Sequence, residues 1–157
     1  MSKKEEIKLH VSLHMVLEFA LRSGTKMFIQ KCQAYGLDVT IDQWLVLGQI
    51  WRHKSISQKQ IATLCVKDKT SITKIINTLE RKNLVVRVVD QIDQRIKRVV
   101  LTNKGNQLFL DVLPIMESTK KIAEKGINER DLKITKVTLQ KIGQNLNSNT
   151  IEPSTKL

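Results

Sequence analysis

The sequence has few cysteines and no long apolar run, and each scarcity excludes a class of protein. Its two cysteines, Cys32 and Cys65, lack C-x-x-C spacing, so neither a disulfide scaffold nor a zinc framework is expected. No segment approaches the roughly 18 apolar residues of a membrane span, and no apolar signal segment follows the charged N-terminus. We therefore expect a soluble protein in the reducing cytoplasm.

The motifs of common enzyme classes are also missing. The sequence contains no glycine-rich phosphate loop, nucleophile elbow, paired carboxylates or metal-binding cluster. His10 and His14 have the i, i+4 spacing of a helical metal pair, but the Glu of H-E-x-x-H and a third ligand are lacking. The sequence predicts no catalytic residues, no metal and no cofactor.

Acidic residues are scarce relative to basic ones. The chain has 27 Lys and Arg against 15 Asp and Glu, a formal net charge of +12. Residues 67–104 hold ten of the basic and four of the acidic residues, which is half of the net charge in a quarter of the chain. Clustered positive charge is typical of a protein whose partner carries phosphates, so this middle segment is the candidate binding surface.

Apolar periodicity predicts six helices and one hairpin along the chain. The expected helices cover residues 7–34, a stretch after a cap at Thr40 or Asp42, residues 57–65, a stretch from a cap at Asp68 or Thr70 to residue 82, residues 103–125 and residues 129–146. Val- and Ile-rich residues 84–89 and 96–101 predict two strands joined by a polar tip. We expect the first helix to be well buried, and Pro114 to kink or break the fifth.

The predicted fourth helix has one apolar and one polar face. Ile72, Ile75, Ile76 and Leu79 fall at i, i+3, i+4 and i+7, and hydroxyl, amide and basic residues occupy the opposite face. Two short helices with a tight break, followed by a hairpin, form a winged helix-turn-helix, whose second helix enters the DNA major groove. The fold class expected is mainly α with a small β-hairpin wing.

This arrangement assigns DNA-binding roles by position. On the fourth helix, the expected base-reading and phosphate-contacting residues are Lys69, Thr70, Ser71, Thr73, Lys74, Asn77 and Thr78. Further phosphate contacts are expected from Ser57, Gln58, Lys59 and Lys67. The wing carries Arg95, Lys97 and Arg98, with Arg95 placed to enter the minor groove and Asp93 expected to hold the tip and aim the Arg95 guanidinium.

Three stretches resemble the MarR family of bacterial regulators. They are Lys-Thr-Ser-Ile-Thr-Lys-Ile-Ile-Asn-Thr-Leu-Glu-Arg-Lys-Asn-Leu-Val (69–85), Asp-Gln-Arg (93–95) and Val-Val-Leu-Thr-Asn-Lys-Gly (99–105). The family's usual Gly after Leu-Glu-x-Lys is Asn83 here, which is the next residue most willing to adopt a left-handed conformation. Gln94 replaces a residue that is often basic in the family, so the wing tip is one charge weaker.

The resemblance implies a homodimer that binds a pseudo-palindromic operator on double-stranded DNA, most often as a repressor, under control of a small ligand or an oxidant. Residues 1–34 and 106–148 would form the helical dimerisation region, 35–105 the DNA-binding region and 149–157 a polar tail, all in a single folding unit. The first helix and the last two carry more apolar surface than one small lobe can cover, which independently favours a dimer. A pocket between the first, second and fifth helices would take a small aromatic acid.

Other, less specific functions also fit this sequence. The basic face also fits a winged-helix module that binds an acidic protein, or a non-specific architectural DNA-binding protein.

Trp44 and Trp51, seven residues apart on one helical face, are expected in the core rather than in a cofactor site. Buried cysteines are more often small apolar residues than redox sensors, so neither cysteine is assigned a role.

Overall fold

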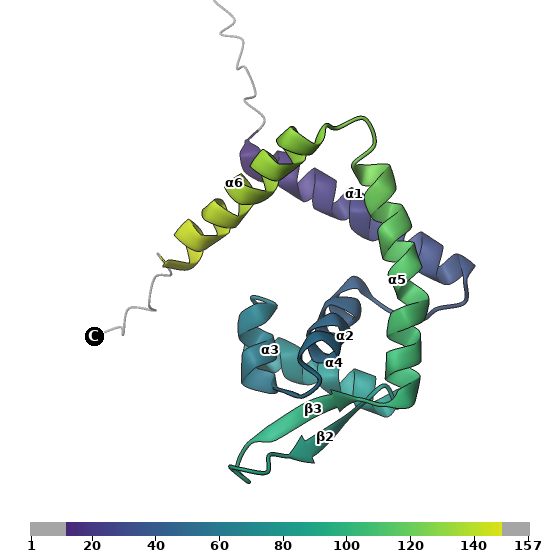
Figure 1. The fold of residues 1–157 in the computed structure, drawn as a ribbon, viewed down its shortest axis with the longest axis vertical. Coiled ribbons are helices and arrows are strands. Elements are labelled where there is room, and N and C mark those ends of the chain that lie inside the picture. Colours follow the sequence, from purple (N-terminus) through teal and green to yellow (C-terminus); the bar gives the residue numbers. More distant parts are fainter. Residues whose placement is uncertain (1–11, 149–157) are drawn as a thin grey trace, which may run out of the picture. The chain divides into compact units, whose positions relative to one another are not determined.

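The structure is a computed structural model that describes residues 12–148; residues 1–11 and 149–157 lie outside the described part. Its elements are α1 (Leu13–Ala34), α2 (Ile41–His53), β1 (Ile56–Ser57), α3 (Gln58–Leu64), α4 (Lys69–Arg81), β2 (Val85–Val89), β3 (Lys97–Leu101), α5 (Asn103–Ala123) and α6 (Glu129–Ser148) (Figure 1). This mainly helical fold with a small sheet confirms the predicted class. The chain divides into two compact units, up to residue 119 and from residue 120 on.

Short polar side chains determine where four of the helices begin. Ser12, Thr40, Ser57 and Asp68 are the N-caps of α1, α2, α3 and α4, each with a side-chain oxygen that accepts a backbone N–H of the first turn. Of the alternatives left open by the sequence, Thr40 rather than Asp42 and Asp68 rather than Thr70 are the caps. The part of the first predicted helix before residue 12 lies outside the described residues.

Residues with a positive φ follow several of the helices. Gly36, just after α1, has φ of 68°, and Asn83, just after α4, has φ of 59°. The prediction that Asn83 substitutes for the usual glycine is therefore confirmed, because this position needs a positive φ. Pro114 lies inside α5, which continues through it, so the predicted alternative of a break was wrong.

The sheet has three antiparallel strands in the order β1-β3-β2. Val85 pairs with Leu101 and Arg87 with Val99 in the hairpin, while Ile56 of β1 pairs with Val99 on the other side of β3. The sequence predicted β2 and β3 but not β1. A strand of two residues shows no alternation of its own, and β1 exists because its backbone pairs with β3.

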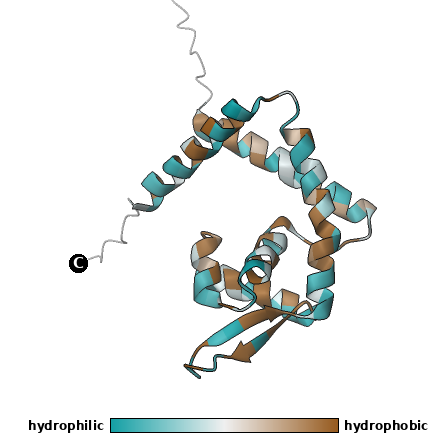
Figure 2. Ribbon diagram, viewed as in Figure 1, coloured by the Kyte–Doolittle hydropathy of each residue, from teal (hydrophilic) through white to brown (hydrophobic). Residues whose placement is uncertain are grey.

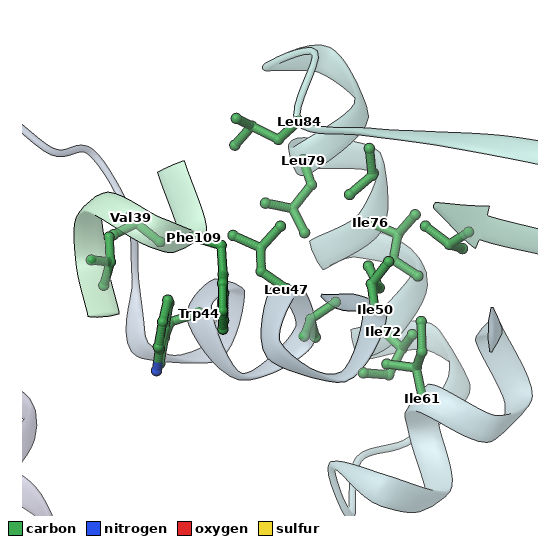
Figure 3. Packing of buried hydrophobic residues seen from close by; sticks show 14 of the residues in the cluster. Val39, Trp44, Leu47, Ile50, Ile61, Ile72, Ile76, Leu79, Leu84 and Phe109 are labelled. Atoms are coloured by element: carbon green, nitrogen blue, oxygen red, sulfur yellow. The ribbon is translucent and has the colours of Figure 1, made fainter. Parts of the chain in front are cut away.

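The core lies between α2, α4 and the sheet. Ile72, Ile76 and Leu79, all fully buried, point from α4 toward Leu47 and Ile50 of α2 (Figure 3). The apolar face predicted for α4 is thus the face that packs inward. Full burial of side chains of this size contributes about 1.5–3 kcal/mol each, so this packing fixes α4 against the domain and leaves its polar face outside.

Aromatic residues and one glycine attach α5 to this core. Phe109 reaches from α5 to Trp44, with ring centroids 4.4 Å apart (Figure 3). It also stacks on Trp51, with ring centroids 5.0 Å apart. Trp44 is buried in the core as expected, whereas Trp51 is 37% exposed, so the expected core position was wrong for Trp51. A Cβ on Gly105 would lie 1.9 Å from the carbonyl oxygen of Leu84, so only glycine allows α5 to begin this close to β2.

The first and last helices have apolar side chains that their own units do not cover. In α1 only Phe28 and Cys32 are buried, so the expectation of a well-buried first helix was wrong. Phe19, for example, is 75% exposed. In α6 no residue is buried, although apolar residues recur between polar ones along it (Figure 2). Within the described residues, no helix is long and apolar enough to cross a membrane.

Candidate nucleic-acid interface

The polar face of α4 carries the predicted reading residues. Lys69, Thr70, Lys74 and Asn77 are exposed there, and Ser71, Thr73 and Thr78 are half-buried. Lys69 and Lys74 form no ion pair with any described residue. The structure thus brings all seven predicted residues of α4 onto or beside one face, and the helix packing keeps that face outside.

The hydroxyls of Ser71, Thr73 and Thr78 on this face already donate hydrogen bonds to residues of α4 or its N-cap. The Ser71 hydroxyl donates to the Asp68 carboxylate at 2.6 Å, and the Ser71 N–H donates to it at 2.8 Å. These bonds hold the pKa of Asp68 below its ordinary value. The Thr78 hydroxyl donates to the Lys74 carbonyl at 3.0 Å and accepts from the Arg81 guanidinium. Ser71 therefore contributes to the cap of α4 as well as to its surface.

The predicted phosphate contacts on α3 have different environments. Lys59 is exposed and forms no ion pair with a described residue, so its charge is available. The Ser57 hydroxyl caps α3 in a capping box with Gln60. Lys67, in the turn between α3 and α4, pairs with Asp42 at 3.1 Å, which leaves it less available than Lys59.

A residue that the sequence analysis did not single out connects α3, α4 and the wing. Arg87 of β2 forms an ion pair with Glu80 and donates to the amide oxygens of Asn77 at 2.7 Å and Gln58 at 2.9 Å. The Gln58 amide nitrogen in turn donates to the Thr73 hydroxyl at 3.1 Å. Strand alternation offered a signal for this role, because Arg87 shares the inward face of β2 with Val85, where a charge requires partners.

In the wing, the predicted residues separate into two kinds. Arg95 and Lys97 are exposed and form no ion pair with a described residue. Arg98 instead forms an ion pair with the buried carboxylate of Asp90. Arg98 thus lies at the base of the wing with its charge compensated, whereas Arg95 and Lys97 present free charges.

Two aspartates shape the wing tip. The Asp93 carboxylate accepts the backbone N–H of Arg95 at 3.0 Å, so it contacts the backbone of that residue rather than its guanidinium. Asp90, which the sequence analysis did not consider, accepts the backbone N–H groups of Ile92 and Asp93 at 2.8 and 2.9 Å. The Arg98 guanidinium and these N–H groups lower the pKa of Asp90 to about 2. Asp90 is therefore the main anchor of the tip.

Comparison with known sequences identifies this helix-turn-helix and wing. Residues 39–97, from the start of the core to the wing, match the model of the MarR family. The matched segment, residues 39–97, is therefore a MarR-family domain. Members of this family are DNA-binding transcriptional regulators and not enzymes.

Relatives and solved structures extend the match beyond the DNA-binding part. The chain is 24% identical over 110 residues to YybA of Bacillus subtilis, an HTH-type transcriptional regulator, covering 70% of this chain and 73% of that one. The S. aureus MepR–DNA complex superposes with a TM-score of 0.78 at 22% identity, over 87% of this chain and 97% of MepR. BpsR of Bordetella bronchiseptica, whose DNA binding is regulated by 6-hydroxynicotinic acid, gives 0.77 at 20% identity, over 84% and 93%.

A cleft lies beside α5, near the place where the sequence predicted a pocket between the first, second and fifth helices. This cleft, of about 830 Å³, is formed by the end of α1, the segment after it and α5, without a residue of α2. Its lining residues are Lys31, Tyr35, Leu37, Leu110, Asp111, Pro114, Ile115 and Ser118. Lys31 donates to the Ser118 hydroxyl at 2.7 Å across the cleft. An ammonium group beside apolar walls suits an organic anion.

Neither cysteine has an activated thiol. Cys32 is buried, and burial raises its pKa. Cys65 is half-buried, and burial again raises its pKa, with Lys67 acting in the opposite direction. Since thiolates are the reactive species, both environments disfavour oxidation. Within the described residues no group of three or more His, Cys, Asp and Glu could hold a metal ion; His10 lies outside them.

Proposed function

We propose that this protein is a MarR-family homodimer that binds a pseudo-palindromic DNA operator with α4 in the major groove and the wing in the adjacent minor groove. The observation that carries this proposal is the set of free cations on α3, α4 and the wing. Lys59, Lys69, Lys74, Arg95 and Lys97 form no ion pair with any described residue. Such charges are what phosphate contacts and minor-groove entry require.

The dimer is supported by the uncovered apolar side chains of α1 and α6. Leu13, Val16, Phe19 and Leu21 of α1 are exposed, as are Ile134, Val137 and Leu146 of α6. Soluble proteins rarely leave large contiguous apolar patches in water, and a second copy is the commonest partner. A two-fold dimer would present two α4 helices to two half-sites, which supports the pseudo-palindromic operator.

We propose repression as the direction of control and the cytoplasm as the place of action. A dimer that occupies two major grooves and two flanking minor grooves covers enough DNA to exclude RNA polymerase from an overlapping promoter. A promoter–reporter fusion carrying the selected operator tests this. Reporter output should fall when the protein is expressed, and a rise would indicate activation.

We propose a small organic acid as the effector, bound in the cleft beside α5, and not an oxidant. The raised pKa values of both cysteines argue against oxidation, whereas Lys31 offers a cation to a carboxylate. Aromatic carboxylates, including 6-hydroxynicotinic acid, should raise the melting temperature of the protein. Lys31→Gln should remove that shift, and a shift retained in this variant would place the ligand elsewhere.

The deciding experiment is selection of bound duplexes from a random pool, at two salt concentrations, with the mass of the protein measured in solution. Enrichment of a two-fold symmetric site by a dimer supports the proposal. Salt-sensitive binding without enrichment indicates a non-specific architectural protein, and weak binding of any duplex indicates a module for an acidic protein partner. Lys74→Ala should relax base preference by about 1–3 kcal/mol at the position it reads and leave the dimer intact.

A further inference from the structure

Arg87 occupies the junction of α3, α4 and β2 and touches two of the side chains proposed to face DNA. Its side chain is only 18% exposed. It forms an ion pair with Glu80 and donates to the side-chain amides of Asn77 and Gln58. An arginine that served phosphate binding would keep its guanidinium in solvent, so these contacts indicate a different role.

The chemistry of arginine fixes how both amides are oriented. A guanidinium carries five N–H donors and no acceptor. The atom of Asn77 that lies 2.7 Å from Nη2 of Arg87 is therefore the oxygen, and its amide nitrogen points the other way. The same reasoning turns the Gln58 oxygen to Arg87 and its nitrogen to the Thr73 hydroxyl. The charge on Arg87 makes these bonds stronger than neutral ones.

This network decides which groups remain for a base edge. The Thr73 hydroxyl gives its only proton to the Lys69 carbonyl at 2.8 Å and accepts from Gln58, so it has no donor left for a base. Asn77 is exposed, and no described residue accepts a hydrogen bond from its amide nitrogen. Gln58 uses one of its two amide N–H donors for Thr73, whereas neither amide N–H of Asn77 is bonded to a described residue, and Asn77 is the more exposed of the two.

We propose that Arg87 is a positioning residue that sets base preference, because it holds Asn77 with the amide nitrogen toward the groove. A donor at this position favours a keto base, guanine through O6 or thymine through O4, because cytosine presents only an amino donor there and adenine offers its N7 acceptor beside an amino donor. The two-bond contact of asparagine with adenine needs the amide oxygen as acceptor, and Arg87 occupies that oxygen. This inference rests on the proposed DNA-binding function.

The sharpest test is Asn77→Asp, assayed by selection from a random duplex pool. The carboxylate has the shape of the amide, so one oxygen keeps the bond to Arg87 and the other presents an acceptor where the amide presented a donor. The favoured base should change from keto to amino at one symmetric position in each half-site, by about tenfold in preference. Preferences are compared within each pool because the added negative charge weakens binding to all sequences.

A second variant tests Arg87 itself. Arg87→Lys keeps a positive charge for Glu80 but has a single nitrogen, which cannot hold Asn77 and Gln58 at once. Preference at the Asn77 position should fall about fivefold while the other positions keep theirs. Arg52→Lys, at the exposed end of α2, is the matched control and should change no position. Thermal unfolding of each variant shows whether it folds.

The possible outcomes separate this inference from the function on which it rests. If the unaltered protein enriches no duplex, the proposed function fails. If it enriches a site and both variants retain every base preference, the role of Arg87 is refuted. Enrichment of adenine or cytosine by the unaltered protein, at the position that Asn77→Asp alters, also refutes it. Should Arg87→Lys not fold, Asn77→Asp decides alone, because Asn77 is exposed on α4.

Discussion

Removal of the wing-tip guanidinium is the perturbation whose effect the structure defines best. Arg95 is exposed and forms no ion pair with a described residue, and the tip is held by Asp90 and by the bond from the Arg95 backbone N–H to Asp93. Arg95→Ala keeps all of these bonds. The free energy of unfolding should therefore change by no more than about 0.5 kcal/mol, and any loss of DNA binding reports the guanidinium itself.

The magnitude follows from counterion release. A dimer has two wings, so the variant loses two cations at the DNA. Each neutralised phosphate contributes about −0.9 to the slope of log affinity against log salt, so the slope should become shallower by about 1.8. When salt is raised from about 50 to about 200 mM, both proteins lose affinity for DNA. The fold-loss of the unaltered protein should be roughly twelve times that of the variant.

Fluorescence anisotropy with the selected duplex, at four or five salt concentrations, measures this slope directly. Arg130→Ala is the control, because Arg130 lies on α6, outside the proposed interface, and is also exposed. It should leave the slope unchanged. Equal slopes for Arg95→Ala and the unaltered protein, or equal losses for the two variants, would refute the placement of the wing against DNA.

Three further predictions concern folding, acid stability and assembly. Gly105→Ala should destabilise the protein by about 1–3 kcal/mol in thermal unfolding, since its Cβ would meet the Leu84 oxygen at 1.9 Å. Gly48→Ala, whose Cβ would lie 3.6 Å from a ring carbon, should be tolerated. The pKa of Asp90 is lowered from 3.8 to about 2, so its contribution to stability is present above pH 4 and lost as pH falls toward 2. The difference in stability between the unaltered protein and Asp90→Asn should shrink over that range; a constant difference contradicts this reasoning. Phe19→Asp should reduce the mass by light scattering from two chains to one, and an unchanged mass would remove α1 from the dimer interface.

The local sequence pattern was sufficient to predict most of the helices and strands. The helix caps and the apolar spacing of α4 are contacts within a few residues, so the sequence placed the start of α3 at Ser57 and narrowed the other two caps to Thr40 or Asp42 and Asp68 or Thr70. The left-handed Asn83 was predictable for the same reason, because few residues tolerate a positive φ. The strand β1 was not predictable, since its two residues become a strand only by pairing with β3.

The polar face of the candidate site could be predicted from the sequence, but the hydrogen bonds between its side chains could not. The sequence by itself determined that α4 has a polar side and that the wing is basic, because helical periodicity and charge are properties of neighbouring residues. Only the tertiary structure decided that Arg98 is compensated by Asp90 and that Arg87 holds the amides of Gln58 and Asn77. These partners lie up to 29 residues apart in the chain and come together only when β2 packs on α3 and α4. Hydrogen-bond geometry depends on that packing, which no local pattern contains.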